Sequence, residues 1–224
     1  MISIKFVDKM GDDFRVFEAA KATLGGEEES GFVRGETDPS RLINFLAREK
    51  HITPFCHPHV TFECEAPIAI ARQLGKHQVG FRWNERSMRY KDSVIDVYVP
   101  DMFRGRPDKL HDGSTEVDVG DKNISGDCVI WTVKKEYELA IKTAISSYKV
   151  LLKAGLAPEQ ARFVLPQGMI TRWIWTGSLY GWYEVWRQRS SEHAQYEARL
   201  FASQLDTHMP SLFPIAWEAL KVNK

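Results

Sequence analysis

Alternating apolar and polar residues predict a small β-sheet. Residues 2–8 and 59–67 carry this pattern, and 96–100 and the β-rich segment 169–176 are expected as further strands. The first, ISIKFVD, has the short alternation of an edge strand. The second, HVTFECEAP, alternates at period two, so Val60, Phe62 and Cys64 are expected on one face.

Apolar residues at three- and four-residue steps predict helices along most of the remaining chain. The expected helices cover 12–24, 38–51, 67–77, 130–153, 157–166, 179–205 and 215–220. Pro67 is expected in the first turn of its helix, where proline is tolerated. The longest helix, 130–153, is closed by Gly155. Its predicted apolar stripe consists of Val133, Tyr137, Ile141, Ala144, Ile145, Tyr148 and Leu152.

Short polar side chains mark the expected helix starts, because they accept hydrogen bonds from the first backbone N–H groups. Asp12 or Asp13 can cap the first helix, and Asp38 or Ser40 can cap the second. The predicted apolar face of the second helix consists of Leu42, Ile43, Phe45 and Leu46. The long C-terminal helix is expected to break near residues 190–191, whose hydroxyls can cap the following piece.

Together these elements predict one α+β domain over residues 1–224, mostly helical with a modest antiparallel sheet. Hydrophobic content of 43% and charged content of 27% are those of a soluble globular protein. Polar segments, including 104–128, are expected to be loops. Lys+Arg and Asp+Glu both total 30, so any basic site is local and the chain does not coat nucleic acid through bulk charge.

The cysteines and the absence of long apolar runs bear on location. Cys56, Cys64 and Cys128 lack CxxC spacing and are odd in number, which favours a reduced, cytoplasmic compartment. Neither a run of about 18 apolar residues nor a charged-then-apolar leader is present. We therefore expect no membrane span and no secretion signal.

Residues 71–90, ARQLGKHQVGFRWNERSMRY, concentrate the candidate binding chemistry. Arg89 offers a planar fork of donors and Ser87 a hydroxyl, so both suit an oxyanion ligand. Glu85 can accept hydrogen bonds from sugar hydroxyls or orient an arginine. The alternative is a solvated face of alternating charge, and the local pattern leaves both open. Neither a P-loop nor a dinucleotide fingerprint is present.

Four motifs, in this order, resemble those of the flavin-dependent thymidylate synthases (ThyX). They are TPFCHPHVTFECEAPIAIARQ (53–73), ARQLGKHQ with NERSMRY (71–90), PEQARFVLP (158–166) and RQRSSEHAQYE (187–197). The resemblance extends over roughly residues 12–220. It implies a ThyX-like fold and a homotetramer whose active sites are shared between subunits.

The resemblance implies reductive methylation of dUMP to dTMP. Methylenetetrahydrofolate would supply the carbon, and FAD reduced by NADPH would supply the hydride, while protein groups bind and polarise. Arg189 would be catalytic, stabilising negative charge at N3 and O2 of the pyrimidine. The implied dUMP-binding residues are Arg72, Gln73, Glu85, Ser87, Met88, Arg89, Arg162 and Arg189. The implied flavin-binding residues are Thr23, His57, Lys76, His77, Gln78, Asn84, Glu85, Ser178, Tyr180, Glu184, Gln188 and His193.

The chain departs from the family pattern at positions that, by the resemblance, would face the flavin. Residues 76–78 read Lys-His-Gln where the family has Arg-His-Arg, and eight residues instead of seven separate them from Ser87. Lys76 keeps the charge but loses the bidentate fork, and Gln78 carries no charge. The alternative function is therefore a homologue that binds nucleotide and flavin without turnover.

Simpler interpretations compete at other positions. His57 and His59 lie between Cys56 and Cys64, but this spacing fits no standard zinc site, so we expect no metal. An aromatic run is expected in the core or at a subunit interface rather than against a cofactor. This run consists of Trp173, Trp175, Trp182 and Trp186. A single-stranded nucleic-acid binder that stacks bases on such rings is disfavoured by the zero net charge.

Overall fold

The computed structural model describes residues 2–22, 38–87, 95–108, 113–124 and 131–223. The chain divides into two compact units. The first unit comprises residues 1–2, 65–73 and 85–172, and the second unit comprises residues 3–64, 74–84 and 173–224. The single domain expected over residues 1–224 stays a prediction.

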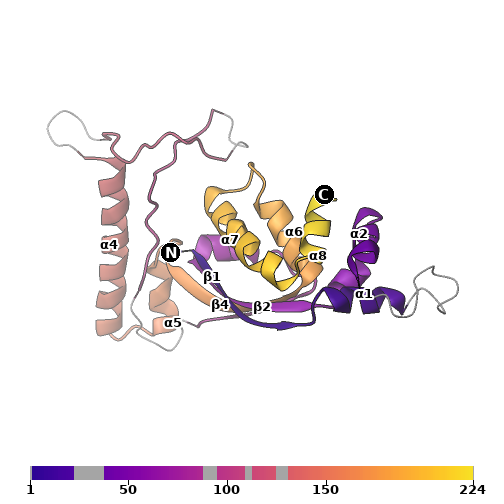
Figure 1. Cartoon of the computed structure of the whole chain (residues 1–224). Coiled ribbons are helices and arrows are strands. Elements are labelled where there is room, and N and C mark those ends of the chain that lie inside the picture. Colours follow the sequence, from indigo (N-terminus) through magenta and orange to yellow (C-terminus); the bar gives the residue numbers. More distant parts are fainter. Residues whose placement is uncertain (1, 23–37, 88–94, 109–112, 125–130, 224) are drawn as a thin grey trace. The chain divides into compact units, whose positions relative to one another are not determined.

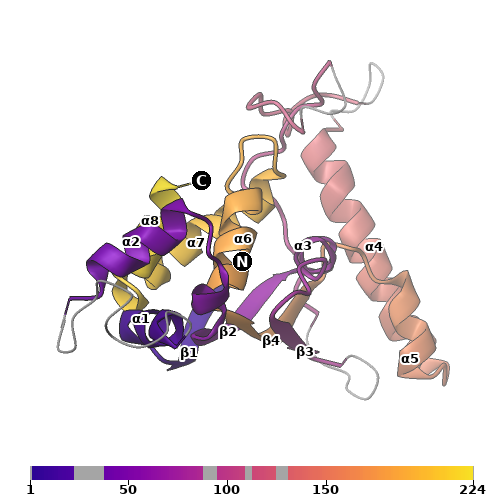
Figure 2. The ribbon, with the colours of Figure 1, turned by 90° about the vertical axis from the view of Figure 1, so that its right-hand side faces the viewer.

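Four strands form one antiparallel sheet in the order β1-β2-β4-β3, as Figure 2 shows. The strands are β1 (Ser3–Met10), β2 (His59–Pro67), β3 (Phe81–Glu85) and β4 (Ile170–Ser178). The prediction of β1 as an edge strand is confirmed. The period of β2 is confirmed as well, because Val60, Phe62 and Cys64 are each 0% exposed.

The predicted strand at 96–100 is wrong. Among the described residues its pairing is an isolated bridge between Val97 and Met169. The N–H of Tyr98 donates to the carbonyl of Gly168 at 2.8 Å. The segment ends in a proline, which has no N–H with which to continue a ladder.

The second unit contains most of the helices among the described residues. Its helices are α1 (Asp13–Lys21), α2 (Ser40–Arg48), the 3₁₀ helix η1 (Thr53–Cys56), α6 (Leu179–Arg189), α7 (Tyr196–Leu212) and α8 (Ala216–Val222). Helix α7 lies over β1, and α2 lies beside α8 (Figure 1). Trp173, Trp175 and Trp182 are at most 2% exposed, and Trp186 is 5% exposed, so the aromatic run forms core.

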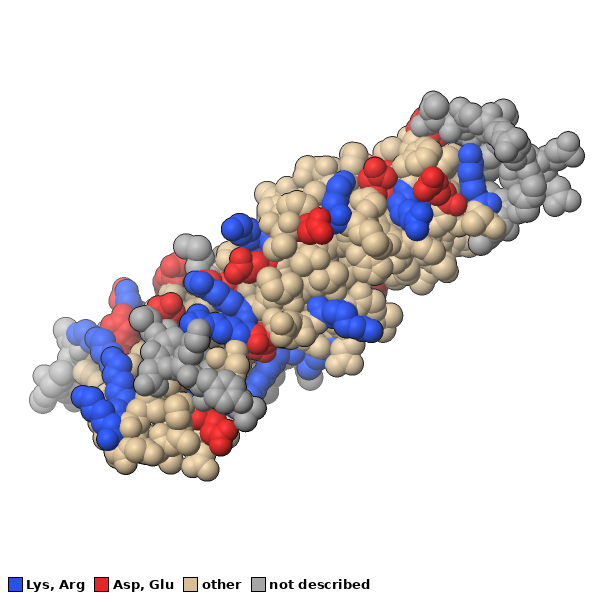
Figure 3. Space-filling view, turned by 90° about the horizontal axis from the view of Figure 1, so that it is seen from below, with Lys and Arg blue, Asp and Glu red and all other residues tan. Residues whose placement is uncertain are grey.

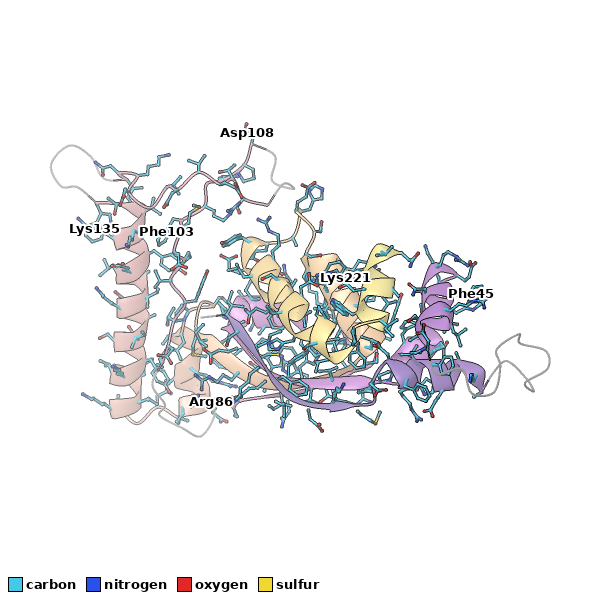
Figure 4. All side chains as sticks on the ribbon, in the orientation of Figure 1. Phe45, Arg86, Phe103, Asp108, Lys135 and Lys221 are labelled. Carbon is cyan, nitrogen blue, oxygen red and sulfur yellow. The ribbon has the colours of Figure 1, made fainter. Side chains whose placement is uncertain are left out.

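Two local predictions for this unit have different outcomes. Asp12 caps α1 as expected, its carboxylate accepting from the N–H groups of Phe14 and Arg15. Phe45 is wrong as a core residue, because it is 42% exposed and projects from the outer side of α2 (Figure 4). Ala47 is buried instead, one turn after Ile43.

The chain does break after α6, at Ser190, but the expected hydroxyl caps are wrong. Helix α7 begins at Tyr196, and its N-cap, Gln195, makes no side-chain cap bond. The Ser191 hydroxyl instead accepts from the N–H of His193 at 3.4 Å, inside the turn that joins the two helices.

The first unit contains the longest helix, α4 (Val133–Lys153), followed by α5 (Pro158–Ala161) and the 3₁₀ helix η3 (Arg162–Val164). The Thr132 hydroxyl caps α4, accepting from the Lys135 N–H. Of the predicted stripe only Tyr148 is fully buried in the chain. The ring of Phe103 meets that of Tyr137 on α4 edge-on (Figure 4).

Helix α3 (Ile68–Leu74) starts one residue later than expected. Pro67 was expected in its first turn, but Pro67 is the last residue of β2. A proline at a strand end leaves no ladder donor missing in the strand interior.

The surface carries no segregated charge on the face drawn in Figure 3, where Lys and Arg alternate with Asp and Glu. None of the helices in the described part of the chain has the length and apolar character that a bilayer crossing requires.

Candidate active site

A cavity of about 560 Å³ lies in the second unit, where the end of η1, the turn before β3 and the start of α6 meet. Its walls are formed by Cys56, His59, Lys76, His77, Gln78, Val79, Gly80, Phe81, Ser178, Tyr180, Gly181, Glu184, Gln188 and Arg189. These residues come from three separate stretches of sequence. The fold therefore brings together polar groups that the chain itself keeps far apart.

The floor of this cavity depends on close contact between Phe81 and two glycines. A Cβ at Gly177 would overlap the Phe81 ring, and one at Gly181 would lie 2.8 Å from it. Gly80 has φ +76°, a conformation that L side chains rarely adopt. The glycines thus leave room for the Phe81 ring to pack against the end of β4 and the start of α6.

His77 and Arg189 form the central polar pair. The Nε–H of Arg189 donates to Nε2 of His77 at 3.0 Å, so that nitrogen carries no proton. Burial lowers the pKa of His77 to about 4, and the Arg189 charge adds to this, while Glu184 opposes it. Burial also lowers the pKa of Arg189. At neutral pH the pair is a neutral imidazole holding a cationic guanidinium.

Glu184 is the acidic residue of the cavity wall, and both of its carboxylate oxygens accept hydrogen bonds. Arg187 donates to it twice, at 3.0 and 2.8 Å, and Gln188 donates once at 3.3 Å. Hydrogen bonding from Arg187 is the main cause that lowers the Glu184 pKa. Burial, and then Glu184, raise the pKa of Tyr180. Tyr180 therefore keeps its proton and can donate it.

Ser178 and Cys56 complete the wall. The Ser178 hydroxyl accepts from the N–H of Gly181 at 3.1 Å and so caps α6. Burial raises the pKa of the Cys56 thiol, so it is protonated at neutral pH. This cysteine is not an activated nucleophile.

A second polar cluster belongs to the first unit. The Thr171 hydroxyl donates to Glu85 at 2.6 Å and fixes the carboxylate near the end of β3. Arg172 is paired with Glu65. The Nε–H of Arg162 donates to the carbonyl of Glu159 at 3.3 Å, and its guanidinium lies 5.9 Å from the Phe163 ring.

The sequence-predicted site residues fall into three groups. Eight line the cavity: Lys76, His77, Gln78, Ser178, Tyr180, Glu184, Gln188 and Arg189. Others lie elsewhere among the described residues: Arg72 and Gln73 on α3, Glu85, Ser87 and Arg162 in the first unit, and His57, Asn84 and His193 off the cavity wall. Thr23, Met88 and Arg89 lie outside the described residues.

Sequence reasoning missed His59 and Phe81 as wall residues. From the sequence, His59 is considered only as a zinc ligand, whereas the structure places it in the cavity wall. No group of three or more His, Cys, Asp or Glu side chains within the described residues is arranged to hold a metal ion.

Comparison with known proteins gives consistent matches over nearly the whole chain. The sequence model described as thymidylate synthase complementing protein (Thy1) matches residues 5–215. The flavin-dependent thymidylate synthase of Kosmotoga olearia is 35% identical, covering 96% of this chain and 88% of that protein. The one of Thermosipho africanus is 32% identical, covering 96% and 89%.

Solved structures give the same match at the level of fold. The UMP/dUMP methylase PolB from Streptomyces cacaoi, bound with 5-Br dUMP, superposes with a TM-score of 0.83 at 27% identity, covering 99% of this chain and 95% of that one. The same enzyme bound with 5-Br UMP gives a TM-score of 0.78 at 28% identity, covering 100% and 95%.

Proposed function

The chain belongs to the family of flavin-dependent thymidylate synthases, and on this basis we propose that it methylates dUMP reductively to dTMP. Methylenetetrahydrofolate is the proposed carbon donor and NADPH the proposed reductant. The observation that carries the proposal is the cavity, in which residues of three of the sequence motifs meet. These residues are Cys56 and His59, residues 76–78, and the pair Gln188 and Arg189.

The cavity residues fit a flavin by their chemistry. Val79 offers an exposed apolar side chain, Lys76 a cation for a phosphate, and Tyr180 a proton donor. When bound, the flavin supplies the hydride chemistry that no side chain can perform. Lys76, His77, Gln78 and Ser178 are the residues that would hold it. Gln78 offers an amide where the family has a second cation, so the phosphate contact depends more on Lys76.

Arg189 is proposed to act on the pyrimidine. A guanidinium beside N3 and O2 stabilises the negative charge that develops there as C5 becomes nucleophilic. His77 fixes this group, because its unprotonated Nε2 accepts the Arg189 Nε–H and leaves the other donors directed elsewhere. Desolvation strengthens this stabilisation, because the electrostatic interaction between two charges is stronger in a low-dielectric site.

Glu85 and Ser87 are proposed to bind the sugar and phosphate of dUMP. Thr171 orients the Glu85 carboxylate through a 2.6 Å hydrogen bond, and a carboxylate has the acceptor capacity to bind a sugar hydroxyl as well. Arg72, Gln73 and Arg162 are proposed to assist from the same unit.

The proposal is tested by supplying purified protein with FAD, dUMP, NADPH and methylenetetrahydrofolate and measuring dTMP by chromatography. The proposal is supported if dTMP forms only when all four added compounds are present. Flavin binding without dTMP formation, with dUMP saturating, would contradict the proposal and favour a binding-only homologue.

UMP is a second candidate substrate, because the structurally similar PolB is described as a UMP/dUMP methylase. UMP differs from dUMP by a 2′-hydroxyl, which is both a donor and an acceptor of hydrogen bonds. A parallel assay with UMP decides between the two, since methylation at comparable kcat/KM would show that the site does not discriminate at the sugar.

We further propose that the chain assembles as a homotetramer in the cytoplasm. The first unit presents large apolar side chains to solvent within a single chain: Leu139 at 45%, Val150 at 60% and Phe163 at 78% exposed. Burying such side chains against another copy stabilises an assembly by about 25 cal/mol per Å² of apolar surface, before the cost of association. The free thiols of Cys56 and Cys64 suit a reducing compartment.

A further inference from the structure

A second cavity, of about 260 Å³, lies in the second unit beside the candidate active site. Its lining comes from α2, η1, α6 and α8, and Tyr180 and Glu184 form part of both cavities. Its apolar wall includes Ile52 at 40% and Leu220 at 5% exposure. The two cavities therefore share a wall of side chains on α6.

Lys50 on the rim of this cavity has an unusual backbone conformation. Its φ is +58°, and it is the non-glycine residue with positive φ in the described chain. It follows α2, where the N–H of His51 donates to the carbonyl of Leu46 and the N–H of Lys50 to that of Ala47, a helix ending that normally selects glycine. A lysine costs stability there, which is the kind of outlier from which a functional role can be argued.

The positive charges among the residues that line this cavity outnumber the negative ones. Arg187 and Glu184 neutralise each other through two hydrogen bonds. Within the described residues no hydrogen bond or ion pair of the Lys50 ammonium is found. The Tyr183 hydroxyl adds a proton donor, because burial raises its pKa. What is left is one cation and one donor above an apolar wall.

We propose that this cavity binds an anionic group, a carboxylate or a phosphate, of a molecule that also carries an aromatic ring. The ring would lie against Ile52 and Leu220, and Lys50 would pair with the anion. This inference rests on the proposed function, because two of its co-substrates carry such groups. They are the benzoylglutamate part of the folate and the 2′-phosphoadenosine part of NADPH.

The test is calorimetric titration of the FAD-loaded protein with two fragments, p-aminobenzoylglutamate and adenosine 2′-monophosphate. We compare the wild type with Lys50→Asn, which tolerates positive φ but lacks the charge, and with the matched control Lys50→Arg. Lys50→Asn is expected to weaken the bound fragment at least about 10-fold, the usual effect of losing a hydrogen bond to a charged group, while Lys50→Arg retains binding.

The variant Lys50→Gly separates the two effects of this residue, because thermal stability and fragment binding are expected to change in opposite directions. Relief of the positive φ is expected to raise Tm by about 2–4 °C while fragment binding is lost. The fragment that responds to Lys50 identifies the co-substrate. Failure of both fragments to bind at millimolar concentration, or equal binding to Lys50→Asn, overturns the proposal. Since no turnover is measured, absence of dTMP formation is a separate result.

Discussion

At the scale of single residues, the decisive contact is the one between Arg189 and His77. A protonated imidazole would repel the guanidinium and could not accept its N–H. Burial keeps the imidazole neutral well below pH 7, with a pKa of about 4. The protein thus has a cation in its active-site cavity whose orientation does not change over the physiological pH range.

Replacing Arg189 by alanine is expected to lower kcat by about 10²–10³-fold, the usual effect of removing one charge-stabilising group. FAD binding, measured by absorbance titration, should change little. Arg48→Ala is the matched control, because Arg48 is exposed and paired with Glu49 away from the cavity. If FAD affinity falls as steeply as kcat, Arg189 has been placed against the wrong ligand.

The lowered pKa of His77 also predicts how stability depends on pH. The unfolded state takes up a proton near pH 6.5, while the folded state does so only near pH 4, so stability falls as the pH drops from 6.5 to 4. Urea unfolding at several pH values measures this loss. In His77→Gln the loss over that window should be smaller than in the wild type; an identical slope would contradict the prediction.

At the scale of elements, Asp206 on α7 joins three helices. Its carboxylate accepts from Trp186 on α6 at 2.8 Å and, on α8, from Trp217 at 3.1 Å and Lys221 at 2.9 Å. Hydrogen bonding of this kind fixes the angle at which α6 and α8 meet α7. The position of the cavity residues on α6 depends on that packing.

Asp206→Asn is expected to reduce the free energy of unfolding by about 1.5–3 kcal/mol, because an amide replaces a carboxylate that accepts three bonds. Urea denaturation monitored by circular dichroism measures the change. Asp101→Asn, at an exposed bend, is the control. Equal stability of the two variants would show that the network contributes nothing net.

Periodicity in the sequence predicted β1, β2, β4 and the main helices, because the apolar residues on the buried face of an element recur at a regular spacing. It failed at Phe45, where an aromatic ring contacts His51 and Arg48 on the surface. The contact between His77 and Arg189 joins positions 112 apart, so no local pattern could reveal it. Only the family resemblance named those residues, and it still missed Phe81 and His59.

At the scale of the whole molecule, the chain divides into two units, and both leave apolar side chains in contact with solvent. The second unit buries the tryptophans of β4 and α6 but exposes Phe45, while the first unit exposes large apolar side chains on α4 and η3. Within one chain such exposure is a cost, and assembly removes it.

Phe163→Glu is expected to reduce the mass of the assembly in solution, because it introduces a charge into the apolar surface of η3. Light scattering coupled to size-exclusion chromatography measures this mass. Phe45→Glu, at an exposed aromatic of the second unit, is the control and should leave the mass unchanged. An unchanged mass for Phe163→Glu would place the subunit contact elsewhere.

The aromatic core beside the cavity has an optical consequence. Trp175 lies 4.6 Å from the Phe81 ring and 4.8 Å from Trp182, and Trp83 stacks on Trp173 at 4.3 Å. Indole emission overlaps flavin absorption, and these rings are packed behind the very wall that a bound flavin would touch. The intrinsic fluorescence of the protein should therefore be quenched as the cofactor enters. Emission would then report occupancy directly, without a label and without turnover.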